Sequence, residues 1–118
     1  MTREQRTLLL LQDMREYAQH AADFIADMHE SDFANNRLVQ FAVVRALEVV
    51  GEAAKGVPDE VRAQAPGVPW KQFAGMRDKP IHRYFGVDAA IVWETVEQDV
   101  PRLVEDIDRL ITELDPGV

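Results

Sequence analysis

The sequence predicts an all-α protein, an antiparallel four-helix bundle with an extra short helix. Three observations support this prediction. Apolar residues recur at steps of three or four in several long segments, which places them on one face of a helix. No segment alternates apolar and polar residues as a half-buried strand does. Short polar or proline-containing breaks separate the long segments, and short connections favour antiparallel neighbours.

The first long helix is expected from about Glu4 to Met28. Its apolar stripe consists of Leu8, Leu11, Met14, Ala18, Ala21, Ile25 and Met28. His20 and His29 lie on this helix or just past it. The carboxylate–histidine spacing of a metalloprotease does not surround them, so we expect solvent-exposed side chains and not metal ligands.

The second helix is expected from about Arg37 to Val57. Residues 31–36 are polar and predict a turn before it, with Asn35 or Asn36 available as its N-cap. Apolar residues nearly encircle this helix, so neighbouring helices or a second subunit should cover more than one of its sides. Its polar residues form one line, which consists of Arg45, Glu48, Glu52 and Lys55. These are either ion pairs at the helix surface, or Arg45 and Glu48 face the basic segment described below and orient it.

Prolines divide the middle of the chain. One short helix is expected from Pro58 to about Ala65, and residues 66–69 (Pro-Gly-Val-Pro) form a second break. A helix then fits from Trp70 to about Lys79. Pro80 disfavours helical geometry at the residue before it, so the chain should bend over residues 81–85.

The last long helix is expected from Asp88 to about Leu114. Its stripe alternates steps of four and three and is the strongest pattern in the chain: Val96, Val100, Leu103, Ile107, Leu110 and Leu114. Pro101 lies inside this helix and should kink it, or restart it as a first-turn proline.

Length and composition predict a single domain over residues 1–118, expected to be cytoplasmic. A chain of this size can bury one core, and no apolar run approaches the roughly 20 residues that a membrane span needs. The absence of cysteine excludes a disulfide framework, a thiolate zinc site and a cysteine nucleophile. The net charge of −8 argues against broad, non-specific coating of nucleic acid.

One stretch reverses this charge. Residues 71–83, here called the basic segment, contain Lys71, Arg77, Lys79 and Arg83 and the single acid Asp78. The basic segment is therefore +3, and the remainder of the chain carries −11. It also contains His82. A basic segment with a titratable histidine inside an acidic protein is a candidate site for a phosphate-bearing ligand.

Arg77, His82 and Tyr84 supply groups that suit cleavage of RNA without a metal or other cofactor. Arg77 carries a planar charged fork that fits phosphate, His82 can give or take a proton, and Tyr84 offers a hydroxyl. RNA brings its own 2′-hydroxyl nucleophile, which DNA lacks. One chain offers a single histidine here, so a two-fold dimer would be needed to supply both an acid and a base. The alternative, a charged cluster that merely closes a bend, stays open on residue types alone.

The pattern Arg77, four residues, His82, one residue, Tyr84 resembles the R-x-x-x-x-H-x-Y signature of the HEPN superfamily. Five segments resemble one branch of it, the HepT-type toxins: residues 51–55 (GEAAK), 69–71 (PWK), 75–78 (GMRD), 84–88 (YFGVD) and 91–96 (IVWETV). The likeness covers nearly the whole chain, from about Glu4 to Leu114.

This resemblance implies a HEPN-like four-helix bundle that forms a homodimer with its motifs facing each other. It also implies a metal-independent ribonuclease that acts as a toxin, paired with a minimal nucleotidyltransferase antitoxin that attaches AMP to the motif tyrosine. Carried over to this chain, Arg77 and His82 are the catalytic pair, and Tyr84 is the AMPylation site. Asp78 is a supporting residue, at a position where the family often has asparagine. Two alternatives remain: a catalytically silent module that binds RNA or a nucleotide or serves for dimerisation, and a plain helical adaptor.

Overall fold

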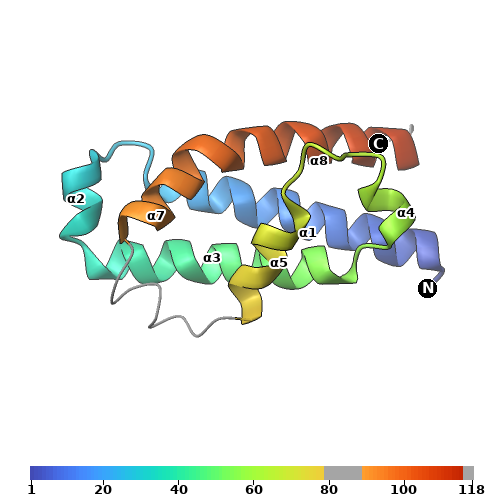
Figure 1. Ribbon diagram of the computed structural model, residues 1–118, viewed down its shortest axis with the longest axis horizontal. Helices are drawn as coiled ribbons and strands as arrows, with labels where there is room; N and C mark the ends of the chain where they lie inside the picture. Colours follow the sequence, from blue (N-terminus) through green and yellow to red (C-terminus); the bar gives the residue numbers. More distant parts are fainter. Residues whose placement is uncertain (79–88, 116–118) are drawn as a thin grey trace.

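The computed structural model describes the backbone of residues 1–78 and 89–115 and the side chains of residues 1–76 and 89–115. Every regular element within these residues is a helix, which confirms the all-α prediction. Three long helices lie lengthwise beside one another: α1 (Arg3–Phe24), α3 (Arg37–Gly56) and α8 (Val100–Leu114). Figure 1 shows that α1 runs opposite to both α3 and α8, as the short connections predicted. No helix in the described residues is both long and apolar enough to cross a membrane.

The first third of the chain differs from the predictions in one helix end and in one additional short helix. Helix α1 ends at Phe24, four residues before the predicted end. The predicted turn contains a short helix, α2 (Glu30–Ala34), because Phe33 is only 1% exposed and packs against Trp93 with ring centroids 5.6 Å apart. Burial of one large ring stabilises a helical turn that the local polar sequence does not predict.

Helix α3 begins and ends close to where the sequence placed it. The amide of Val39 donates to the side-chain oxygen of Asn36 at 3.1 Å, which confirms Asn36 as the N-cap. At the other end, the guanidinium of Arg62 donates to the backbone oxygens of Val57 and Lys55, at 2.9 and 3.1 Å. These bonds satisfy carbonyls that the end of the helix leaves without intrahelical partners.

The short helices of the second half follow the proline breaks. Helix α4 (Asp59–Arg62) ends three residues before the predicted Ala65, and Pro58 precedes it as the N-cap residue. Helix α5 (Trp70–Asp78) follows the predicted helix from its first residue, and the predicted end at Lys79 lies outside the described residues. It crosses α3 rather than lying parallel to it, as Figure 1 shows.

The last predicted helix is divided into three parts. Helix α7 (Ala89–Glu94) continues into a π-helical turn, η1 (Thr95–Asp99), and then into α8. The predicted disturbance at Pro101 is therefore a π turn just before it. Proline lacks the amide hydrogen that an α-helix needs, and its ring clashes with the carbonyl four residues earlier. The wider turn, in which the amide of Val100 donates to the carbonyl of Thr95 five residues back, accommodates it.

The core lies where α1, α3, α5 and α8 meet. Its fully buried large side chains include Leu11, Met14, Val43, Val50, Phe73, Leu103, Ile107 and Leu110. Every α8 member of this set belongs to the predicted stripe. His20 and His29 are both exposed, as predicted.

Candidate functional site

Helix α5 carries the first residues of the predicted site, and its beginning is firmly anchored. The indole nitrogen of Trp70 donates to the carbonyl of Ala65 at 3.0 Å, and the Trp70 side chain is 8% exposed. One turn later, Phe73 is completely buried. An aromatic side chain that is buried and hydrogen-bonded holds a short helix that would not be stable alone.

The predicted site begins at the C-terminal end of this helix. Arg77 and Asp78 are its last two residues, so the structure places their backbone at the end of α5. Their side chains lie outside the described part of the chain, and so do His82 and Tyr84. The predicted bend over residues 81–85 also falls there. The roles assigned to these four residues therefore stay predictions.

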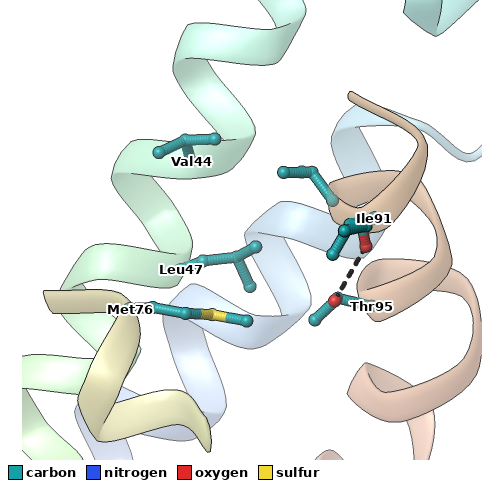
Figure 2. A pocket seen from close by; sticks show the side chains of 6 residues that line it. Val44, Leu47, Met76, Ile91 and Thr95 are labelled. Carbon is teal, nitrogen blue, oxygen red and sulfur yellow. Dashed lines mark hydrogen bonds between the residues drawn. The ribbon is translucent and has the colours of Figure 1, made fainter. Parts of the chain in front are cut away.

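The helices on both sides of residues 79–88 meet on the same face of α3. A small apolar pocket of about 20 Å³ lies between them, and its lining residues are Val44, Leu47, Met76, Ile91, Val92 and Thr95. They come from α3, α5, α7 and η1. Figure 2 shows Met76 extending past Leu47 toward Thr95. Side chains from the helices on both sides of residues 79–88 therefore border one pocket beside α3.

Thr95 is a polar residue in this apolar contact. Its side chain is only 3% exposed, and its hydroxyl donates to the carbonyl of Ile91 at 2.9 Å (Figure 2). A buried hydroxyl without a hydrogen bond would be costly, so this bond makes Thr95 compatible with its apolar surroundings. A threonine that lies off the stripe of the last helix gave no sign in the sequence that it contacts α5.

A second contact joins α5 to the π turn. The side-chain amide of Gln72 donates to a carboxylate oxygen of Asp99 at 3.2 Å. Sequence reasoning missed this pair, since 27 residues separate its members and each is an ordinary surface residue type.

The polar line along α3 supports one of its two interpretations. Arg45 and Glu48 form an ion pair of 2.8 Å, with Arg45 67% exposed and Glu48 16% exposed. This is the ion pair at the helix surface that the first interpretation expected. The second interpretation, in which these residues orient the basic segment, stays a prediction because the relevant side chains lie outside the described residues.

Exposed apolar side chains gather on α3 and on the start of α7. Leu38 is 80% exposed, Phe41 47% and Ile91 50%. Ile91 also lines the pocket that residues of α3 and α5 share. Large exposed apolar side chains on neighbouring helices are candidates for an interaction surface.

Comparisons with known proteins identify the family of the chain. The family model described as "Ribonuclease HepT-like" matches residues 14–110, which include the whole Arg77–Tyr84 motif. "Putative RNase MJ0125" of Methanocaldococcus jannaschii is 42% identical over 105 residues, which cover 89% of this chain and 90% of that protein. "Probable ribonuclease HepT" of Thermococcus cleftensis is 41% identical over 100 residues, which cover 85% of this chain and 91% of that protein. No solved structure gave a significant match. The chain therefore belongs to the ribonuclease HepT-like family, a family of ribonucleases, and the resemblance drawn from its motif is confirmed.

Proposed function

We propose that this protein is a metal-independent endoribonuclease that acts as a homodimer and serves as the toxin of a toxin–antitoxin pair. The observation that carries this proposal is a ribonuclease family match that spans an intact Arg77, His82 and Tyr84. The placement of Arg77 at the end of an anchored helix supports it. A module that only binds RNA has no need for all three residues.

In the proposed reaction, His82 of one copy removes the proton of the ribose 2′-hydroxyl. The 2′-oxygen forms a bond to phosphorus, and the bond from phosphorus to the 5′-oxygen of the next nucleotide breaks. The leaving oxygen takes a proton from His82 of the second copy. Arg77 stabilises the negative charge that develops on the phosphate oxygens. The products are a cyclic phosphate and a 5′-hydroxyl, with no oxidation or reduction.

The exposed apolar surface of Leu38, Phe41 and Ile91 supports the homodimer. One of its members, Ile91, lines the same pocket as Met76 of α5. A dimer formed there would also join two basic segments of charge +3 each, which would favour RNA binding in a protein whose net charge is −8.

The proposed antitoxin is a minimal nucleotidyltransferase that modifies Tyr84. The tyrosine oxygen attacks the α-phosphate of ATP, pyrophosphate leaves, and the phenolic proton goes to solvent or to a base of the transferase. The attached AMP brings a negative phosphate and a bulky nucleotide to the place where RNA phosphate would bind, which explains inhibition.

RNA cleavage by purified protein tests the nuclease. In the presence of a chelator, wild-type protein should cleave total RNA, and His82→Ala should be slower by about 100-fold or more, since general acid–base catalysis contributes roughly that much. His20→Ala is the matched control, because His20 is an exposed histidine on α1. Cleavage that persists in His82→Ala, or wild-type protein that binds RNA without cleaving it, would overturn the enzyme proposal in favour of a silent binding module.

Mass spectrometry tests the modification. Incubated with its nucleotidyltransferase and ATP, the protein should gain mass in AMP units and lose ribonuclease activity. Tyr84→Phe should gain none, whereas Tyr17→Phe, which changes the other tyrosine of the chain, should be modified normally. Modification of Tyr84→Phe would show that the site is assigned wrongly.

A further inference from the structure

We infer that the π turn η1 is a positioning device for α5, and that Gln72, Thr95 and Asp99 are positioning residues for the ribonuclease site. One hydrogen bond and one shared pocket relate these elements. Gln72 donates to Asp99, and Met76 and Thr95 line the same small pocket (Figure 2). This inference rests on the proposed function, because the site that is positioned is the one that begins at Arg77.

The spacing of these residues matters. Gln72 and Met76 are four residues apart on α5, and Asp99 and Thr95 are four residues apart on η1. Residues four apart lie on the same side of a helix, about one turn from each other. Packing of the buried Phe73 holds α5 on the core, and the Gln72–Asp99 hydrogen bond opposes rotation of α5 on the side where Met76 and Thr95 border one pocket. Arg77 follows Met76 directly, so this rotation determines where the last turn of α5 starts.

The π turn explains how α8 can pack on the core while the residues just before it face α5. Each residue of an α-helix advances the direction of its side chain by about 100°. The extra residue of a π turn therefore rotates the preceding helix relative to α8 by roughly that amount. Helix α8 keeps its stripe in the core, with Leu103, Ile107 and Leu110 each at most 1% exposed. Thr95 and Asp99 can then face α5 at the same time.

Misplacement of Arg77 would weaken catalysis more than folding. Neither partner of the hydrogen bond is buried, since Gln72 is exposed and Asp99 half-buried. Loss of such a bond changes stability little. Stabilisation of a transition state depends steeply on the position of the stabilising group, and an error of about 1 Å can cost up to about 100-fold in rate.

Glutamate at position 72 tests the contact without changing its size. Gln72→Glu sets a second carboxylate against Asp99, and like charges at this distance repel. We expect its kcat for a short RNA to fall about fivefold with KM within about twofold of wild type, since the loss affects the positioning of a catalytic group and not the binding of substrate. Adding Asp99→Asn restores an amide–carboxylate hydrogen bond with the roles exchanged and the wild-type net charge. The double variant should return to within about twofold of the wild-type kcat.

Gln98→Glu is the matched control, because it adds the same charge at an exposed position of the same π turn. Equal losses in Gln72→Glu and Gln98→Glu would reduce the effect to added negative charge and would overturn the inference. A double variant that stays as slow as Gln72→Glu would overturn it as well.

Hydrogen exchange of the α5 amides gives a second measurement that needs no activity. The amides of residues 72–76 should exchange faster in Gln72→Glu than in wild type, and at the wild-type rate in the double variant. If wild-type protein cleaves no RNA, the proposed function is wrong. Hydrogen exchange still shows whether the Gln72–Asp99 hydrogen bond stabilises the position of α5. Unchanged exchange in Gln72→Glu would overturn the positioning role whether or not the protein is a nuclease.

Discussion

Helices α3 and α8 are both long and both contribute to the core, but they use their apolar residues differently. Helix α8 has one apolar stripe, which is buried against the bundle except for Leu114 at its end. Helix α3 has apolar residues nearly all round. Part of this surface is buried by α1 and α5, while Leu38 and Phe41 near its beginning remain exposed. Most of the α8 stripe is therefore used within the bundle, whereas the beginning of α3 leaves large apolar side chains exposed in the described part of the chain.

The largest expected effect is a difference in the free energy of unfolding between a variant of α8 and a variant of α3. Leu110 of α8 is completely buried, so Leu110→Ala should lower the free energy of unfolding by about 2–5 kcal/mol in denaturant titrations. Leu38→Ala makes the same chemical change on α3, where the side chain is 80% exposed, and should change stability by no more than about 0.5 kcal/mol. Comparable losses in the two variants would mean that the exposed part of α3 belongs to the core of the folded unit.

The second test asks whether a second copy covers the exposed part of α3. Leu38→Glu should raise the dissociation constant of the proposed homodimer by about tenfold or more, since a charge would replace an apolar side chain whose burial contributes about 1.5–3 kcal/mol. Sedimentation over a concentration series measures this shift. Leu9→Glu provides the control on α1, where Leu9 is 47% exposed. A dimer that is weakened equally by both changes would place the interface elsewhere.

A smaller effect, of opposite sign, is expected in α5. A Cβ atom at Gly75 would meet no atom of the described residues within 4 Å, and glycine inside a helix is less favourable than alanine. Gly75→Ala should therefore raise the free energy of unfolding by about 0.5–1 kcal/mol. At Gly56, the end of α3, a Cβ would lie 2.9 Å from Leu10 Cδ1, so Gly56→Ala should gain less. RNA cleavage by Gly75→Ala then shows whether substrate or a second copy needs the space beside α5. An unchanged or lowered stability in Gly75→Ala would contradict the open surroundings that the structure gives this residue.

The smallest effect is expected between α1 and α8. Arg15 and Asp108 form an ion pair, but their side chains are 51% and 46% exposed. A double-mutant cycle with Arg15→Gln and Asp108→Asn should give a coupling of about 0.2–1 kcal/mol that decreases with added salt. A coupling well above this range would show that polar contacts, and not the buried stripe alone, hold α8 in place.

Much of the fold could be predicted from periodicity and helix breakers. Three features follow from local rules that depend on a few neighbouring residues: the stripe of α8, the N-cap at Asn36 and the start of α5 after Pro69. The helix α2 could not be predicted, because what stabilises it is the burial of Phe33 against Trp93, sixty residues along the chain. The π turn was only partly predictable. Pro101 indicated that the helix is disturbed. Whether the disturbance is a kink or a π turn depends on how the helix packs before and after it.

The candidate site could likewise be predicted only in part from the sequence. The sequence by itself determined the family, the motif Arg77, His82 and Tyr84, and the reversal of charge around it, because these depend on residue types and spacing along the chain. Only the tertiary structure decided that residues of α3, α5, α7 and η1 line one pocket, and that Gln72 donates a hydrogen bond to Asp99. The physical reason is that such contacts arise from the packing of whole helices, whose relative directions depend on the complete core and not on any local pattern.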